Sequence, residues 1–599
     1  MCGFFAIVYN KRNPQLGNIL KRAGGKLSYR GYDSTGIAVF EKDGKYGIYK
    51  DKGHVDDVAL RLGFGNYGGY KGIIQLRWAT YGKPSKRNSQ PHSDCTGDYV
   101  AAHNGNIINV HHLFRELTEE GHSIRSKNDG EVVVHIMEEG LKTKNLNDAV
   151  RYTYERIKGD YAYCFTDRND RRITAVKKGS SLFAGIGDGF ICVSSDYYAI
   201  LDHTDRIVFI NDGEMINFSH DHFTVSDILT GRKKKRRAKR NNVDAEIMEK
   251  EPYDSFMEKE ISEVPLKLET LREYYLSTRN LSKLRRILSS SHLNITGSGT
   301  SYNAAFLGTY FMNRIAGLDV GTYLPSEISD RLRYINKHNS NLMVVTQSGE
   351  TKDIKNAIDV FRSYSDGKII GMINNLGSTI AVMSDFVLPT ISDMEISVPA
   401  TKTFINQIAL FYIISLYMSG MKMKDIDSKL DILIKYISSV KREDSSIRMF
   451  ADKLTGKRNM HVLGYSLTYP VALESALKMK EVNYKHIEAM HSSEFKHGPL
   501  ALISRDYPVI LITTRRDKHY TLSHINEIQT RKGQIFCICQ PDEDLRNNAD
   551  FTLEIDIDDE NLFAIAAAYV MQTVALQIAY NKGIDPDKPK NISKTITVD

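Results

Sequence analysis

The second half of the chain contains an internal repeat, and this repeat limits its fold more than any other feature. An apolar segment that ends at Gly297 recurs 167 residues later, where it ends at Gly464. Gly367 and Gly533 each open a further apolar segment and lie 166 residues apart. Within each copy the pattern predicts alternating strands and helices, which is typical of a parallel sheet covered by helices. Self-similarity at a fixed period indicates duplicated structural units, so two α/β domains are predicted here.

Each copy also contains a long stretch without charged residues, at 403–421 and 562–581. Length alone would permit a membrane span. However, both stretches occupy corresponding places near the end of their copy, and a helix that packs against a sheet and a second copy can be apolar nearly all round. We therefore expect buried core helices. Because the N-terminus also shows no basic-then-apolar leader, a cytoplasmic location is expected.

The composition is that of an ordinary folded protein with several domains. The chain has 599 residues, of which 41% are hydrophobic and 26% are charged. This balance excludes a disordered or collagen-like chain, and the length suggests about four compact units. The six cysteines show neither the spacing of a disulfide framework nor that of a metal site. We expect buried thiols in a reducing compartment.

A basic run marks the region between the two halves. Eight of the nine residues at 232–240 are Lys or Arg, although the net charge of the whole chain is only +7. Nucleic-acid-binding proteins spread their basic groups over a face rather than concentrate them in one run. The run is therefore interpreted as a solvated loop or linker, with the domain boundary between about residues 228 and 265.

The first half is predicted to be rich in strands, and it begins with a candidate nucleophile. Removal of Met1 would leave Cys2 with both a thiol and a free α-amine, whose ordinary pKa of about 7.7–8.0 suits a general base. By itself Cys2 could equally be an inert buried cysteine. Three further motifs accompany it: Tyr29-Arg30-Gly31-Tyr32-Asp33-Ser34, Arg77-Trp78-Ala79-Thr80 and His103-Asn104-Gly105.

With these motifs the first half resembles the class II, N-terminal-nucleophile glutamine amidotransferases. The resemblance implies an α+β sandwich of the αββα type. It also implies that Cys2 attacks the amide of glutamine, forms a thioester and releases ammonia. The Asn104 side chain and the Gly105 N–H would stabilise the oxyanion of the tetrahedral intermediate. Arg77 would hold the glutamine carboxylate, and Asp129 would hold its α-ammonium group.

The same resemblance places three more residues at the glutamine site. Arg30 would order the loop near the nucleophile, Trp78 would gate the passage of ammonia, and Thr80 would contact glutamine. Trp78 is the only tryptophan of the chain and could alternatively be a core aromatic residue. One position departs from the family pattern, because Tyr81 stands where most members have His. A role for an imidazole at that position would be lost.

Two turns rich in hydroxyl groups follow successive predicted strands of the first repeat. They read Thr296-Gly297-Ser298-Gly299-Thr300-Ser301 and Thr346-Gln347-Ser348-Gly349-Glu350-Thr351. Glycines let backbone N–H groups approach an anion, and hydroxyls at a helix start add donors. Since neither turn carries the lysine of a Walker loop, the pair favours a sugar phosphate over a nucleotide. The second repeat lacks both turns and is expected to contribute catalytic side chains instead.

Candidate catalytic side chains occur in the second repeat and in the C-terminal tail. Lys478 and Glu481 lie three residues apart on one face of a predicted helix, His497 lies in a turn, and Lys594 lies in the tail. Taken singly, these would be a solvated ion pair, a hydrogen-bonded turn histidine and a frayed terminal lysine. Together with the two turns, they resemble the sugar-isomerase (SIS) domains of the glutamine–fructose-6-phosphate aminotransferase (isomerizing) family, also called glucosamine-6-phosphate synthases.

The resemblance covers essentially the whole chain and implies a reaction without cofactor or metal. Glutamine and fructose 6-phosphate would give glucosamine 6-phosphate and glutamate, the first step of amino-sugar biosynthesis. His497, from the partner subunit of a homodimer, would open the sugar ring, and Lys594 would form a Schiff base with the ketone. Glu481 would move the proton between C1 and C2, while Lys478 assists at a hydroxyl. The residues implied to bind the sugar and its phosphate are Thr300, Ser301, Thr346, Gln347, Ser348, Thr351, Val398 and Ser593.

The implied order of domains is as follows. A glutamine amidotransferase domain occupies 2–220 and a linker 221–283; two doubly wound parallel-sheet α/β SIS domains follow at 284–423 and 451–589, and a tail at 590–599.

One departure and two alternatives stay open. Pro399 stands in place of the residue that usually follows Val398 in the family, and it removes a backbone donor beside the sugar site. One alternative is an amidotransferase with another acceptor; it is disfavoured because neither an Asp-Asp pyrophosphate motif nor a Ser-Gly-Gly-x-Asp-Ser loop appears. The other is a non-catalytic sugar-phosphate sensor, which has no need of Glu481, His497 and Lys594 together.

Overall fold

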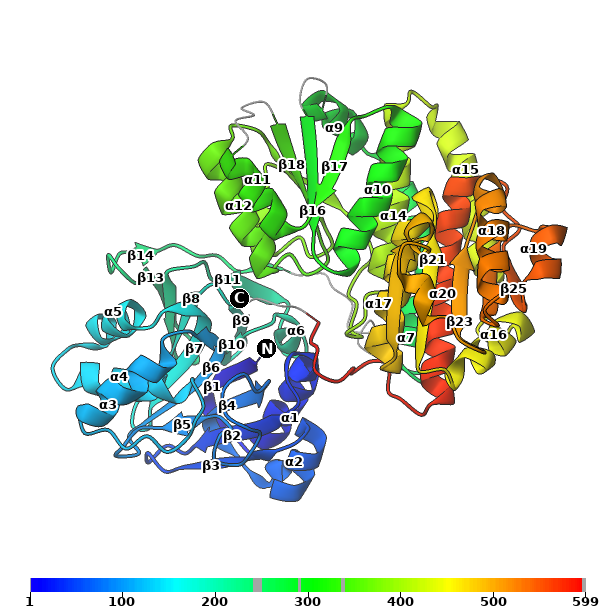
Figure 1. Cartoon of the computed structure of the whole chain (residues 1–599). Helices are drawn as coiled ribbons and strands as arrows, with labels where there is room; N and C mark the ends of the chain where they lie inside the picture. The colour runs from blue at the N-terminus through cyan, green and yellow to red at the C-terminus, as the bar shows by residue number, and fades with distance from the viewer. Residues whose placement is uncertain (1, 241–249, 289–291, 335–339, 595–599) are drawn as a thin grey trace. The chain divides into compact units, whose positions relative to one another are not determined.

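The computed structural model describes residues 2–240, 250–288, 292–334 and 340–594, and these residues form two compact units (Figure 1). Unit 1 contains the described residues up to 240, and unit 2 contains those from 250 to 594. Each unit has its own sheets and its own hydrophobic core.

Unit 1 is built on two antiparallel sheets. The eight-stranded sheet has the order β15-β11-β9-β10-β1-β4-β2-β3. Its strands are β1 (Gly3–Asn13), β2 (Ser34–Phe40), β3 (Tyr46–Lys52), β4 (Gly69–Arg77), β9 (Phe183–Gly187), β10 (Phe190–Ser194), β11 (Arg206–Phe209) and β15 (Lys239–Arg240). The seven-stranded sheet has the order β14-β13-β12-β8-β7-β6-β5. Its strands are β5 (His92–Ser93), β6 (Tyr99–Ile107), β7 (Gly159–Asp167), β8 (Ile173–Lys178), β12 (Glu214–Phe218), β13 (Phe223–Asp227) and β14 (Lys233–Lys234).

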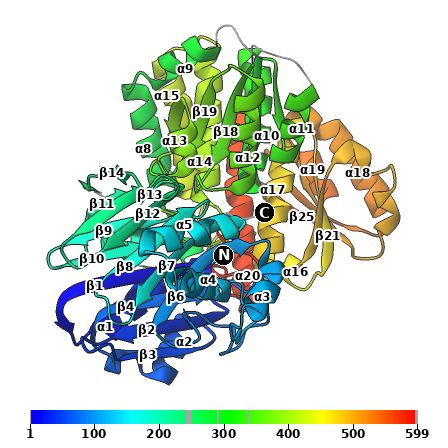
Figure 2. The same ribbon diagram turned by 90° about the vertical axis from the view of Figure 1, so that its left-hand side faces the viewer.

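The two sheets pack face to face, and helices cover both outer faces (Figure 2). Phe4, Ala6 and Val8 alternate along β1 and pack with Val100 and Ala102 of β6 between the sheets. The outer face of the eight-stranded sheet is covered by α1 (Leu16–Leu27), α2 (Val55–Leu62) and α6 (Tyr198–Leu201). The outer face of the seven-stranded sheet is covered by α3 (Val110–Glu119), α4 (Glu131–Leu141) and α5 (Leu146–Arg156). This αββα sandwich confirms the predicted fold.

The basic run at 232–240 belongs to the sheets of unit 1. Lys233–Lys234 forms β14 and pairs with β13, while Lys239–Arg240 forms β15 and pairs with β11. Arg236, between them, forms an ion pair with the buried Glu214. The prediction of a loop or linker is therefore wrong for these two strands, although Lys233 and Lys234 are exposed as expected. Basic side chains on edge strands also discourage pairing with another chain.

Unit 2 contains two five-stranded parallel sheets with the same strand arrangement, as the repeat predicts. The first has the order β17-β16-β18-β19-β20 and the second β22-β21-β23-β24-β25. The first sheet consists of β16 (His292–Gly297), β17 (Val320–Tyr323), β18 (Ser340–Thr346), β19 (Ile369–Ile373) and β20 (Phe386–Pro389). The second consists of β21 (Asn459–Gly464), β22 (His486–His491), β23 (Pro508–Ile512), β24 (Gln534–Cys539) and β25 (Phe551–Glu554). One face of each sheet contributes to a shared core, and the other face has a cluster of its own.

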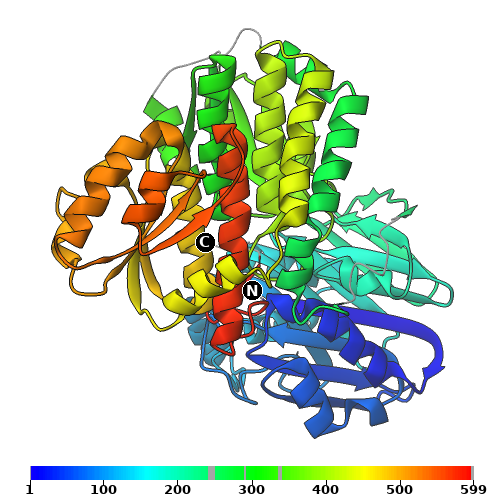
Figure 3. The same ribbon diagram turned by 90° about the vertical axis from the view of Figure 1, so that its right-hand side faces the viewer.

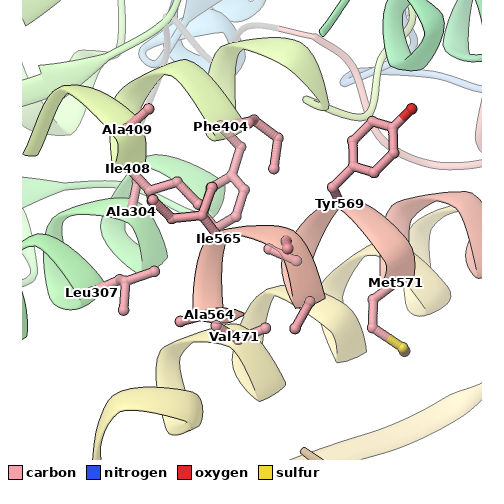
Figure 4. Close-up of a cluster of buried hydrophobic side chains, with 14 of the residues drawn as sticks. Ala304, Leu307, Phe404, Ile408, Ala409, Val471, Ala564, Ile565, Tyr569 and Met571 are labelled. Atoms are coloured by element: carbon pink, nitrogen blue, oxygen red, sulfur yellow. The ribbon is translucent and has the colours of Figure 1, made fainter. Parts of the chain in front are cut away.

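The long apolar stretches are buried helices of that shared core. They form α14 (Lys402–Met418) and α20 (Glu560–Asn581), which pack with α10 (Thr300–Ala316) and α17 (Tyr469–Asn483). Figure 4 shows side chains from all four helices in contact, and in Figure 3 the red α20 runs along the middle of unit 2. Among the described residues, α20 alone has the length and hydropathy of a membrane span, and its apolar window is 100% buried. The prediction of core helices is confirmed.

Gly308 lets α10 approach α14 closely, and we expect Gly308→Ala to destabilise unit 2. A Cβ at this position would lie 2.3 Å from the ring of Phe411. Overpacking costs about 1–3 kcal/mol, which exceeds the gain of about 1 kcal/mol from alanine's higher helix propensity. Denaturant unfolding followed by circular dichroism measures the loss. Gly456→Ala is the control, because nothing lies within 4 Å of its added Cβ. Equal stability of the two variants would contradict the close approach.

Candidate active sites

The sulfur of Cys2 lies beside the end of β4. Cys2 directly precedes β1, and the first residue of that strand, Gly3, pairs with Leu76 of β4. The Cys2 thiol donates a hydrogen bond to the carbonyl oxygen of Trp78 at 3.5 Å. Burial raises the pKa of the thiol, and the Asp129 carboxylate adds to this effect. The thiol is therefore neutral near pH 7 and needs a base before it can act as a nucleophile.

Arg77 and Asp129 bring opposite charges close to that nucleophile. Arg77 ends β4 and is only 1% exposed; its Nη2 donates to the carbonyl oxygens of Tyr81 and Gly82. Its Nη1 has no hydrogen-bond partner among the described residues. Asp129 is buried just before α4, and its Oδ2 accepts the N–H of Ile107 at 3.2 Å. A guanidinium and a carboxylate so placed can bind the two charged groups of an amino acid.

Asn104 and Gly105 are neighbours on β6. The side chain of Asn104 is buried, and neither its Nδ2 nor its Oδ1 has a partner in the described part of the chain. Because side chains alternate along a strand, Asn104 shares the face of Val100, which points into the core between the sheets. Gly105 has a φ of +124°, and a Cβ there would lie 2.1 Å from the carbonyl oxygen of Asp160. Only glycine fits this position.

Arg30, Trp78 and Thr80 have different surroundings. Arg30 is buried and forms an ion pair with Asp196, with 3.2 Å between Nη2 and Oδ2. The ring of Trp78 is half-buried and meets the edge of the Tyr32 ring at a centroid distance of 5.4 Å. Thr80 is exposed in the loop after β4. A supporting position for Arg30 and a covering position for Trp78 are compatible with this geometry.

In unit 2 the two hydroxyl-rich turns lie next to each other. β16 and β18 are parallel neighbours, so the turns that follow them share one edge of the sheet. Gly299 has a φ of +56° directly before α10, and Gly349 donates its N–H to Thr346 Oγ1 at 3.1 Å. The Oγ of Ser298 is buried and unpaired within the described residues. Helix starts, backbone N–H groups and free hydroxyls suit a phosphate.

The other predicted sugar ligands divide into two groups. Gln347, Ser348 and Thr351 lie in the second turn, and Ser301 accepts a hydrogen bond from Gln407 at 3.2 Å. Val398 and Ser593 lie in other loops of unit 2. The backbone N–H of Val398 donates to the carbonyl oxygen of residue 587 at 3.0 Å, which fixes the loop that Pro399 interrupts.

Thr300 links the first repeat to the catalytic candidates of the second. Its Oγ1 donates to Glu474 at 3.1 Å and accepts from Lys478 Nζ at 3.1 Å. Lys478 is fully buried and lies 2.5 Å from a carboxylate oxygen of Glu481. Burial raises the pKa of Glu474 to about 7, against the opposing effect of Lys478. Burial lowers the pKa of Lys478, but Glu481 and Glu474 outweigh it and raise that pKa overall, so the lysine stays charged.

Lys594 is held in a buried ion pair. Its side chain is 4% exposed, and its Nζ lies 2.6 Å from Oε2 of the fully buried Glu395. The other oxygen of Glu395 accepts the N–H of Thr401 at 2.8 Å. Burial and the charge of Glu395 raise the pKa of nearby Glu260 to about 8. Since Glu395 also acts on the pKa of Lys478, the two clusters share one electrostatic environment.

His497 lies outside these clusters. It is exposed in the turn before η6 (Pro499–Leu502), and its backbone N–H donates to the carbonyl oxygen of Glu494 at 3.0 Å. Across the described ranges, no hydrogen bond or ion pair joins its side chain to Lys478, Glu481 or Lys594.

Comparison with full-length relatives identifies the family of this chain. A curated protein of Pyrococcus horikoshii named glutamine–fructose-6-phosphate aminotransferase [isomerizing] is 36% identical over 606 residues, which cover 100% of both chains. A protein of the same name from Aquifex aeolicus is 34% identical over 584 residues, which cover 96% of each chain. The chain belongs to this family.

Domain comparisons agree with this membership of the glutamine–fructose-6-phosphate aminotransferase family. A family model described as SIS domain matches residues 286–416 and 453–582, and one described as glutamine amidotransferase domain matches 76–202. A solved structure of the C-terminal domain of glucosamine-fructose-6-phosphate aminotransferase from Francisella tularensis is 25% identical with a TM-score of 0.51. It covers 57% of this chain and 99% of that one. The predicted fold, an amidotransferase sandwich followed by two SIS domains, is confirmed.

Three buried acidic residues near the candidate sugar site escaped sequence analysis. Glu474 could have been predicted from the sequence, because it lies four residues before Lys478 on the same helical face. No sequence pattern pointed to Glu395 or Glu260. The lysine that pairs with Glu395 lies 199 positions away along the chain, so no local pattern connects them.

The raised pKa of Glu260 predicts a pH-dependent stability. Its pKa moves from an ordinary 4.5 to about 8 on folding, so the native state binds this proton more tightly. The proton on Glu260 therefore stabilises the folded state fully below pH 4.5, and this stabilisation is lost as the pH rises towards about 8. Glu260→Gln should remove a slope of about 1 kcal/mol per pH unit from the free energy of unfolding. Denaturant midpoints of the full chain across this range measure it.

The control is Glu273→Gln, which changes an exposed carboxylate of α8 (Val264–Ser277). It should leave the slope unchanged. An unchanged slope in Glu260→Gln would show that its proton is not bound differently in the folded chain.

Proposed function

We propose that the chain converts glutamine and fructose 6-phosphate into glucosamine 6-phosphate and glutamate. The names of its full-length relatives support this reaction. The observation that carries it is the burial of Lys594 against Glu395, since lysine side chains are ordinarily exposed to solvent. A sugar-phosphate sensor would need the phosphate turns but not this lysine, so the geometry favours catalysis.

The first half-reaction uses Cys2. After removal of Met1, the freed α-amine takes the proton of the buried thiol, directly or through water. The sulfur attacks the amide carbon, and the oxyanion is stabilised by Asn104 Nδ2 and the Gly105 N–H. The carbon–nitrogen bond breaks, the α-amine returns its proton to the leaving nitrogen as ammonia, and water then hydrolyses the thioester to glutamate. Arg77 and Asp129 hold the substrate by its α-carboxylate and α-ammonium groups.

The second half-reaction takes place at the edge of the first SIS sheet. The two turns bind the phosphate, and the ketone lies towards Lys478 and Lys594. Lys594 gives up its proton, for which Glu395 is the nearest acceptor at 2.6 Å, and attacks the ketone carbon with loss of water. Ammonia replaces the lysine in the imine. Glu481 then transfers a proton between C1 and C2, and Lys478 supports the neighbouring hydroxyl.

We further propose a cytoplasmic homodimer in which His497 acts on the sugar bound to the partner subunit. An exposed imidazole without a side-chain partner in the described residues is free to serve a neighbouring chain. None of the six cysteines, all of which are described, forms a disulfide, which supports a reducing compartment.

Isotope labelling tests both half-reactions together. The chain is incubated with fructose 6-phosphate, glutamine carrying nitrogen-15 at the amide, and excess unlabelled ammonium. Mass spectrometry should find the label in glucosamine 6-phosphate, because ammonia formed at Cys2 is used before it mixes with the solvent pool. Unlabelled product would contradict internal transfer, and glutamate without amino sugar would contradict the acceptor.

Two variants separate the half-reactions. Cys2→Ala should lower glutamine-dependent synthesis by about 10³-fold or more, because the nucleophile is lost. Lys594→Arg keeps the charge but forms no Schiff base, so it should lose synthesis and keep glutamate release. Loss of both activities in Lys594→Arg would point to a folding defect, which circular dichroism would reveal.

Mixing two inactive variants tests the assignment of His497. His497→Asn and Lys594→Arg each lack one residue of every site. Random exchange of subunits at equal amounts should restore about a quarter of the wild-type activity if His497 acts on the partner's substrate. No recovery after verified exchange would show that His497 serves its own subunit or none.

A further inference from the structure

Four side chains with metal-binding atoms converge in unit 1, outside the residues assigned to glutamine. Cys95 follows β5, His122 lies in the loop after α3, and His135 and Glu138 lie on α4. Their ligand atoms all lie within 4.8 Å of one another. The two histidines and the glutamate are buried, and the cysteine is half-buried.

Four of the six distances between the ligand atoms are close to the edges of a tetrahedron around an ion. The Sγ of Cys95 lies 3.5 Å from Nδ1 of both histidines. Oε2 of Glu138 lies 3.0 Å from Nδ1 of His122 and 3.2 Å from Nδ1 of His135. A tetrahedron with zinc–sulfur and zinc–nitrogen bonds of about 2.3 and 2.0 Å has sulfur–nitrogen edges of about 3.5 Å and nitrogen–oxygen edges of about 3.3 Å. The sulfur–nitrogen distances of 3.5 Å and the nitrogen–oxygen distances of 3.0 and 3.2 Å in the structure are close to these values.

The outer ring nitrogens face further carboxylates. Nε2 of His122 lies 3.0 Å from Glu139, and Nε2 of His135 lies 3.7 Å from Glu131. Metal-bound histidines usually donate their second N–H to a carboxylate, which fixes the tautomer and turns the other nitrogen towards the ion. The backbone N–H of Ser123 also donates to the cysteine sulfur at 3.3 Å, which favours the thiolate.

The tautomer of the two rings decides whether hydrogen bonds can satisfy the cluster. With protons on Nδ1, both rings would donate to Glu138. When both rings are protonated at Nε2, both Nδ1 atoms present lone pairs towards the sulfur and the carboxylate. A thiol has one weakly donated proton and satisfies at most one of these acceptors. A cation at the centre satisfies all four groups at once.

We propose that Cys95, His122, His135 and Glu138 bind one zinc ion. Thiolate, imidazole and carboxylate ligands in a tetrahedron suit zinc, and four protein ligands leave no position for substrate, so the site is structural. Binding releases the thiol proton. The ion joins the segment after β5, the loop after α3 and helix α4, which starts two residues after Asp129.

Metal analysis of the full chain tests the site. The chain is expressed with zinc and without a polyhistidine tag, and is then dialysed against metal-free buffer. Elemental mass spectrometry should find about one zinc per chain. Cys95→Ala and His122→Gln should each lower the retained zinc about tenfold or more. Cobalt in place of zinc should give the intense visible bands of tetrahedral coordination and a sulfur-to-cobalt charge-transfer band that Cys95→Ala removes.

His112→Gln is the matched control, because His112 is exposed on α3 and lies outside the cluster. It should retain the full zinc content. A wild-type chain that binds neither zinc nor tetrahedral cobalt would overturn the proposal, and this result needs no variant that folds. Zinc content unaffected by both ligand substitutions would also overturn it.

Discussion

The burial of apolar helices between two parallel sheets determines the structure of unit 2. α14 and α20 direct nearly all their side chains into one core, and helices of both repeats contribute to it. Because this core holds α10 and α17 together, Thr300 of the first repeat reaches Glu474 and Lys478 of the second. Neither repeat by itself contains both the two hydroxyl-rich turns and these charged side chains. The site therefore depends on the packing of apolar surface that takes no part in chemistry.

The same packing makes the buried charges depend on one another. A buried ammonium or carboxylate without a partner is costly, so each lysine of the site is paired: Lys478 with Glu481, and Lys594 with Glu395. Burial, and to a lesser degree the neighbouring carboxylates, raises the pKa of both Glu260 and Glu474. Carboxyl groups that hold protons near neutral pH can exchange them with a bound ligand without separating charge in a medium of low dielectric constant.

Sequence analysis correctly predicted the features of the fold that follow from a repeated pattern. The 167-residue repeat predicted two parallel-sheet domains, and the structure has two sheets of identical strand arrangement. The two strands of the basic run escaped it because each has only two residues and no apolar alternation. Glu395 escaped it because its partner Lys594 is distant along the chain. A tertiary contact between residues so far apart cannot be predicted from the sequence pattern around either one.

The second repeat lacks the two hydroxyl-rich turns of the first. In the first repeat, β16 is followed by Ser298, Gly299 and Thr300. In the second, β21 is followed by Tyr465, whose ring packs against His491 and Tyr520 at centroid distances of 4.8 Å. Aromatic side chains thus occupy the edge at which an anion would bind. The second repeat has the same strand arrangement and shares the core, and its helix α17 places Lys478 within hydrogen-bond distance of both Thr300 and Glu481.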